Sequence, residues 1–93
     1  MNKLAAITVA LGLLASSSAI AAERTVTLVV QNMYCAACPH TVRASLQAVL
    51  GVKNVTVSLR QKTAVVTYDD AKTDVMALTA ATNNAGYPSS PRS

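Results

Sequence analysis

The chain has 93 residues, of which 52% are hydrophobic and 13% charged, and its formal net charge at pH 7 is +4. A chain of this length holds one small domain at most. The basic residues are scattered along the sequence, and no Phe or Trp lies among them. This pattern argues against nucleic acid as a partner, because nucleic-acid binding needs a concentrated basic face with stacking aromatic side chains.

The first 22 residues are typical of a secretory signal peptide. Lys3 provides a basic start, an apolar run covers residues 4–15, and residues 19–21 form a small-residue cleavage signal, Ala-Ile-Ala. The apolar run is shorter than the roughly 18 residues that a membrane-spanning helix needs. We therefore expect residues 1–22 to be cleaved, leaving an exported, periplasmic domain of residues 23–93 without stable membrane insertion.

A strand and a helix are predicted at the start of this domain. Residues 25–31 alternate in side-chain character, which predicts a half-buried strand with Val26, Leu28 and Val30 on one face. Apolar residues then recur at helical spacing, and Gly51 is a C-terminal stop signal. The residues that recur at this spacing are Cys38, Val42, Leu46 and Val49.

A hairpin and a second helix follow. Two alternating runs, residues 54–59 and 63–68, predict the two strands of the hairpin. Thr73 is the expected N-cap of a helix that ends at Gly86. The expected buried face of this helix consists of Val75, Leu78, Thr82 and Ala85.

The last residues, 87–93, can add a fourth strand. Pro88 and Pro91 restrict this segment to an edge strand, or to a strand of no more than a few residues, because proline has no N–H donor for a central ladder. The resulting order is β-α-β-β-α-β, the order of ferredoxin-like α+β folds. We expect a four-stranded antiparallel sheet with both helices on one face.

The residues that carry chemistry are two cysteines in the turn between the first strand and the first helix. Cys35 and Cys38 are separated by two alanines, and Cys38 falls in the first helical turn. The positive end of the helix dipole favours an anion there, so the Cys38 thiolate should form readily. Two thiolates suit a soft ion with linear coordination, Cu(I) by the softness rule and Hg(II) by its extension. Structural zinc is disfavoured because it takes four ligands.

Two other interpretations of the C-x-x-C spacing remain open. A thioredoxin-type redox dithiol has the same spacing, but this domain is short, its strand order differs and its spacer is Ala-Ala. An inert cysteine pair would have to lie inside a core, whereas these cysteines are expected in a turn. Metal binding is favoured, although a disulfide between Cys35 and Cys38 would block it.

Other candidate ligands near the cysteines are weaker. His40 is expected to face solvent from the first helix rather than to act as a third ligand. Met33 is a possible thioether ligand, but a methionine beside a strand end more often fills the core. Tyr87 is as compatible with plain packing as with a place near the metal. Met76 is expected on the surface of the second helix or at the edge of the core.

The segment from Asn32 to Cys38, Asn-Met-Tyr-Cys-Ala-Ala-Cys, resembles the G-M-T-C-x-x-C loop of heavy-metal-associated domains. This family includes copper chaperones and the metal-binding modules of copper-pumping ATPases. The residues after Cys38, the ending Ala-Gly-Tyr-Pro-Ser-Ser (85–90) and the signal peptide are similar to the periplasmic mercury-binding branch of the family. Asn32 stands where the family motif usually has Gly. Asn suits this position because it accepts a left-handed backbone conformation better than most residues. Tyr34 stands where the motif has Thr.

The resemblance implies a non-enzymatic periplasmic mercury scavenger that acts in mercury resistance. It implies that one Hg(II) per chain binds the thiolates of Cys35 and Cys38 and passes by thiol exchange to an inner-membrane mercuric transporter with a cysteine pair. Cys35 would be the more exposed thiolate, and Tyr87 would approach the metal loop. Small thiols are further expected partners, and the domain is expected to be a monomer. The alternatives are a periplasmic Cu(I) chaperone and a thiol-disulfide oxidoreductase.

Overall fold

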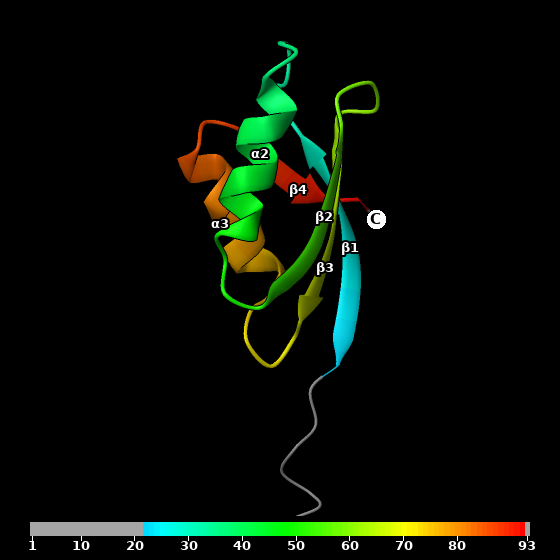
Figure 1. The fold of residues 1–93 in the computed structure, drawn as a ribbon, viewed down its shortest axis with the longest axis vertical. Helices are drawn as coiled ribbons and strands as arrows, with labels where there is room; N and C mark the ends of the chain where they lie inside the picture. The colour runs from blue at the N-terminus through cyan, green and yellow to red at the C-terminus, as the bar shows by residue number, and fades with distance from the viewer. Residues whose placement is uncertain (1–21, 93) are drawn as a thin grey trace, which may run out of the picture.

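The computed structural model describes residues 22–92, so the expected signal peptide lies outside the described residues except for Ala22. Four strands form one antiparallel sheet in the order β2-β3-β1-β4, and both helices cover the same face of it (Figure 1). The predicted ferredoxin-like βαββαβ fold is confirmed. The elements are β1 (Glu23–Val30), α2 (Cys38–Gln47), β2 (Val52–Ser58), β3 (Thr63–Asp69), α3 (Val75–Asn84) and β4 (Ser89–Pro91).

The sheet face beneath the helices is apolar because alternate residues of the two central strands point towards it. Leu28 and Val30 of β1 lie in the core, as the alternation predicted, together with three residues of β3 and the inner faces of both helices. The opposite face is more polar. There Thr25 and Thr67 are directly paired, and their hydroxyl oxygens lie 3.1 Å apart. The full set of buried apolar residues is Leu28, Val30, Met33, Cys38, Val42, Leu46, Val55, Ala64, Val66, Tyr68 and Leu78.

The N-cap of α3 differs from the prediction. Asp74, not Thr73, caps the helix, and its carboxylate accepts a hydrogen bond of 2.9 Å from the Ala77 N–H. A carboxylate at this position also interacts favourably with the positive end of the helix dipole, which favours Asp over Thr. The other end differs too, because Ala85 is an exposed C-cap residue and not part of the buried face.

The end of α2 also comes earlier than the spacing predicted. The helix stops at Gln47, so Val49 lies in the following turn and packs only partly against the core. Gly51 then adopts a φ of +100°, and a Cβ atom there would lie 2.7 Å from the Cβ of Lys72. Glycine is required at this turn because any other residue would be strained and would collide with Lys72.

The last strand is a short edge strand, as its two prolines predicted. β4 has three residues and pairs with β1 alone. It is also tied to α3, since the hydroxyl oxygens of Thr82 and Ser89 lie 2.6 Å apart. Among residues 22–92, no helix is long and apolar enough to span a membrane.

Candidate metal site

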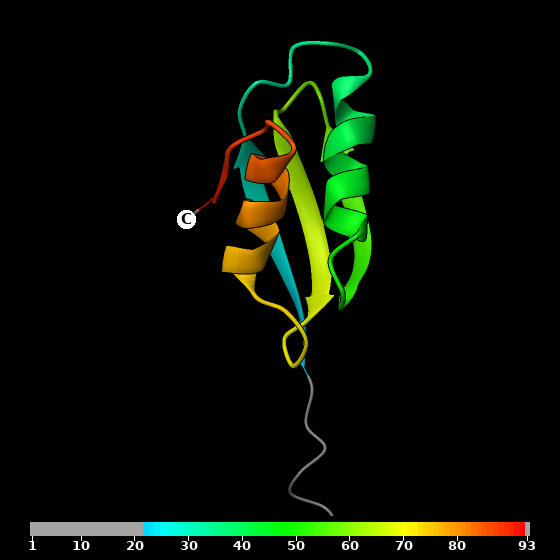
Figure 2. The ribbon, with the colours of Figure 1, turned by 90° about the vertical axis from the view of Figure 1, so that its left-hand side faces the viewer.

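The two cysteines belong to the loop between β1 and α2, residues 31–37 and the first turn of the helix, which we call the metal loop (Figure 1). The β2–β3 turn (59–62) and the α3–β4 loop approach it at the same end of the molecule (Figure 2). Three segments that are far apart in the sequence therefore meet at this end. The site is formed by tertiary contacts and not by the C-x-x-C motif alone.

The two sulfur-bearing residues have different surroundings. Cys35 is exposed, whereas Cys38 is only 6% exposed and belongs to the hydrophobic core. The expectation that both cysteines lie outside the core is therefore wrong for Cys38. Its place in the first turn of α2 puts it on the same helical stripe as Val42 and Leu46, which face the sheet. The greater exposure of Cys35 agrees with what the family resemblance implied.

Cys35 and Cys38 are joined by a disulfide, and their Cα atoms lie 5.2 Å apart. The backbone N–H of Cys35 donates to the Cys38 sulfur over 3.3 Å. In the reduced protein, the same N–H and the N-terminal end of α2 would both favour a thiolate at Cys38. The loop thus brings two sulfurs to one place, and after reduction it would stabilise negative charge on the buried one.

Other potential ligands do not join the two sulfurs. Within residues 22–92, no three His, Cys, Asp or Glu side chains gather in a way that would hold a metal ion. His40 is exposed on α2 and Met33 is completely buried in the core, and both placements match the expectations from the sequence. The candidate donor set in the described part of the chain is therefore two sulfurs, which fits a two-coordinate soft ion.

The start of the metal loop is tied to the α3–β4 loop by two hydrogen bonds. Asn32 adopts a φ of 71°, in the left-handed region, as expected for an Asn in place of Gly. Its side-chain amide donates to the Gly86 carbonyl over 3.1 Å, and the Gln31 N–H donates to the Pro88 carbonyl over 2.8 Å. Tyr87 lies between these two anchor points and packs partly against the core.

Lys62 is the residue near the site that sequence analysis missed. It stands at the end of the β2–β3 turn with a φ of 59°, and its ammonium donates to the Met33 carbonyl over 2.6 Å. The same ammonium lies 5.4 Å from the ring centroid of Tyr34. A basic residue in a hairpin turn carries no signal of such contacts, because they depend on how the turn folds against the metal loop.

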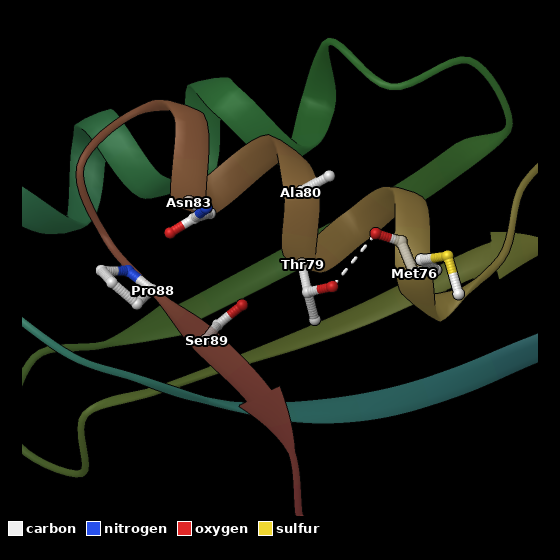
Figure 3. Close-up of a pocket in the computed structure, with 6 residues that line it drawn as sticks. All are labelled: Met76, Thr79, Ala80, Asn83, Pro88 and Ser89. Atoms are coloured by element: carbon white, nitrogen blue, oxygen red, sulfur yellow. Dashed lines mark hydrogen bonds between the residues drawn. The ribbon is translucent and has the colours of Figure 1, made fainter.

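A cavity of about 290 Å³ opens between α3 and β4 (Figure 3). Neither cysteine lines it, and the Thr79 hydroxyl at its wall is already bound to the Met76 carbonyl over 3.0 Å. Met76 itself is 78% exposed, in line with its expected place on the helix surface. This cavity is separate from the candidate metal site. Its lining residues are Met76, Thr79, Ala80, Asn83, Pro88 and Ser89.

Comparisons with known proteins identify relatives in both sequence and fold. The family model of the heavy-metal-associated domain matches residues 27–88. The mercuric transport protein periplasmic component of Shewanella putrefaciens is 55% identical over 76 residues, which cover 82% of this chain and 84% of that protein.

Two solved structures of MerP share 53% sequence identity with this chain and cover 77% of it and 100% of their own length. The oxidized form from Ralstonia metallidurans CH34 has a TM-score of 0.76. The mercury-bound form, described as the periplasmic protein of the bacterial mercury detoxification system, has a TM-score of 0.69. On this evidence of matching sequence, loop motif and fold, the chain belongs to the heavy-metal-associated domain family.

Proposed function

We propose that the chain is a periplasmic mercury carrier that binds one Hg(II) between the thiolates of Cys35 and Cys38. The main observation in support is the cysteine pair, because one exposed and one buried cysteine are brought together at one end of the fold. Support comes from the relatives, one named as a periplasmic component of mercuric transport and another solved in a mercury-bound form. Residues 1–22 would direct export as a signal peptide and would then be removed.

Binding in this proposal begins with reduction of the disulfide. Two molecules of a small thiol reduce Cys35–Cys38 to two thiols and become a disulfide themselves. Hg(II) then displaces the two thiol protons and forms two metal–sulfur bonds. With bonds of about 2.3 Å, a linear site needs sulfurs roughly 4.6 Å apart, and a C-x-x-C loop can span this separation.

The unequal exposure of the two sulfurs gives the proposed transfer a direction. A thiolate of the recipient adds to the bound ion, the bond to the exposed Cys35 breaks, and that cysteine takes up a proton. A second recipient thiolate then displaces the buried Cys38 in the same way. The proposed recipient is the cysteine pair of an inner-membrane mercuric transporter. The ion passes between ligands without being chemically converted, so the chain acts as a carrier and not as an enzyme.

Cu(I) transport is the second candidate function, because two thiolates suit Cu(I) as well as Hg(II). Thiol-disulfide exchange is the third candidate function. The observation that supports it is the Cys35–Cys38 disulfide, in which Cys35 is exposed. An insulin-reduction rate comparable with that of a thioredoxin would favour this third candidate over a carrier.

The test of the carrier proposal is metal retention by the domain of residues 23–93. The reduced domain is equilibrated with Hg(II) in excess glutathione and desalted, and mercury is counted per chain. We expect one Hg(II) per reduced chain. The matched control is the double variant Cys35→Ser, Cys38→Ser, which should retain none because it has no thiolate for the ion. Equal mercury retention by the parent and this variant would overturn the two-thiolate site.

A further inference from the structure

The arm of the metal loop that precedes Cys35 is held from two sides. The Met33 side chain is completely buried in the core, and the Met33 carbonyl receives the Lys62 ammonium over 2.6 Å. Hydrogen bonds with a charged donor are roughly twice as strong as those between neutral groups. The main chain two residues before Cys35 is therefore fixed by both the core and the β2–β3 turn.

Tyr34 completes this arrangement. Its side chain is 81% exposed, and the Lys62 ammonium lies 5.4 Å from its ring centroid. A cation at this distance from an aromatic ring is attracted by the negative face of the ring. One ammonium thus contacts the residues at both of the positions directly before Cys35.

Lys62 is itself held in place for these contacts. Its φ of 59° is a conformation that non-glycine residues seldom adopt. Its carbonyl accepts a hydrogen bond of 2.8 Å from the Val30 N–H, at the end of β1. Residues held in such conformations by surrounding structure are concentrated at functional sites. The sheet thereby sets the position of the Lys62 backbone, and the Lys62 side chain sets the position of the loop arm.

We propose that Lys62 is a positioning residue for metal capture, which acts through the Met33 carbonyl and the Tyr34 ring to hold Cys35 ready to bind an ion together with Cys38. Cys35 is exposed and does not belong to the hydrophobic core, so in the reduced protein its side chain would otherwise lose conformational freedom when the ion binds. Because Lys62 holds the loop arm before the ion binds, it reduces the conformational entropy that Cys35 loses on binding. The proposal rests on the carrier function proposed above.

The test compares reduced variants in a Hg(II) competition against glutathione. Lys62→Met keeps most of the aliphatic stem but removes the donor, and we expect a loss of about 10-fold in apparent Hg(II) affinity, the range seen for residues that orient metal ligands. Lys62→Arg keeps a charged donor and should restore most of the affinity. Met and Arg are unbranched at Cβ, so both variants bear the same left-handed backbone cost as the parent.

Lys53→Met is the matched control. Lys53 lies near the start of β2, at the opposite end of the strand from the β2–β3 turn, and its side chain is 55% exposed. This variant removes the same charge and should bind Hg(II) like the parent. Thermal unfolding of each metal-free variant separates a loss of folding from a loss of capture. If Lys62→Met does not fold, Lys62→Gln replaces it, and a several-fold loss of affinity is expected.

Three outcomes would each overturn either the carrier function or the positioning role of Lys62. If the parent retains no Hg(II), the carrier function itself fails. If the parent retains Hg(II) and both Lys62→Met and Lys53→Met equal it, the positioning role of Lys62 is overturned. If Lys62→Met and Lys62→Arg lose affinity equally, donation from Lys62 is not what holds the loop, and the proposal is overturned as well.

Discussion

The Asn32 side-chain amide donates a hydrogen bond of 3.1 Å to the Gly86 carbonyl and so joins the metal loop to the α3–β4 loop. Asn32 reaches this carbonyl from a left-handed backbone conformation, φ 71°. Glycine would adopt the same conformation without strain but would provide no side chain. Asparagine at this position therefore combines the backbone role of the family's glycine with a tether between two loops.

Replacing Asn32 separates these two contributions. We expect Asn32→Gly to lower the free energy of unfolding by about 1 kcal/mol, from the lost hydrogen bond and the greater entropy of the unfolded chain. Asn32→Ala should lower it by about 1–3 kcal/mol, because Ala loses the tether and is also strained at positive φ. Urea unfolding of the reduced proteins measures both. A glycine variant as stable as the parent would show that the tether contributes nothing.

The two cysteines should respond differently to substitution by serine. Cys38→Ser places a hydroxyl at a position that is 6% exposed, which should cost about 1–3 kcal/mol of stability if the hydroxyl finds no partner. Cys35→Ser changes an exposed residue and should be nearly neutral when both proteins are compared in reduced form. Thermal unfolding under reducing conditions distinguishes them. Equal destabilisation would contradict the described difference in burial.

The N-cap of α3 offers a paired test. Asp74→Ala removes the acceptor for the Ala77 N–H and should cost about 1 kcal/mol. The neighbouring Thr73 hydroxyl is buried without a hydrogen-bond partner among the described residues. Thr73→Val should therefore leave stability unchanged or raise it slightly, because it removes an unsatisfied polar group. Urea unfolding of the two variants checks the assignment, and a larger loss for Thr73→Val would reverse it.

Acid sensitivity is expected from Asp70. The side-chain hydrogen bond from Arg24, 2.7 Å long, and the bond from the Ala22 N–H lower the pKa of this carboxyl below its ordinary value of 3.8. A carboxyl with a lowered pKa in the folded state stabilises the fold above its unfolded-state pKa, and this contribution is lost as the pH falls through the lowered value. The pair is exposed, so the effect should be small and should weaken with salt.

Thermal midpoints measured between about pH 2 and 7 test this expectation. Asp70→Asn should reduce the fall in midpoint on the acidic side and should leave the difference between the variants constant above pH 5, where the carboxyl is fully ionised. Glu23→Gln is a suitable control, because its contact with Lys53 is longer, at 3.7 Å, and exposed. Parallel acid curves for the parent and Asp70→Asn would contradict the assigned role.

Much of the fold follows from local patterns in the sequence. Alternation along β1 predicted which of its residues share one face, and the prolines near the C-terminus predicted a short edge strand. The errors lie at element ends, where Asp74 and Thr73 are both good caps and the difference between them depends on side-chain geometry. Val49 was placed on a helix that stops at Gln47, since spacing alone does not show where a turn begins.

The candidate site could be predicted only in part. The C-x-x-C motif identified both cysteines and their place beside the first helix. The burial of Cys38 follows from its helical register with Val42. It was not predicted, because both cysteines were expected to lie in a turn outside the core. The contact of Lys62 with Met33 joins residues 29 positions apart in the sequence. Such a contact depends on packing between two loops, and neither loop carries a pattern that indicates it.

The most direct test of the central claim is a competition titration of the reduced domain with Hg(II) and with Cu(I), each in excess glutathione, followed by thiolate-to-metal absorption. We expect that one Hg(II) is retained per chain, that Cu(I) is removed by glutathione, and that Cys35→Ser and Cys38→Ser each abolish retention of Hg(II). Retention of Cu(I) as firm as that of Hg(II) would contradict a mercury-selective carrier. Parent-like Hg(II) binding by either serine variant would contradict the two-thiolate site itself.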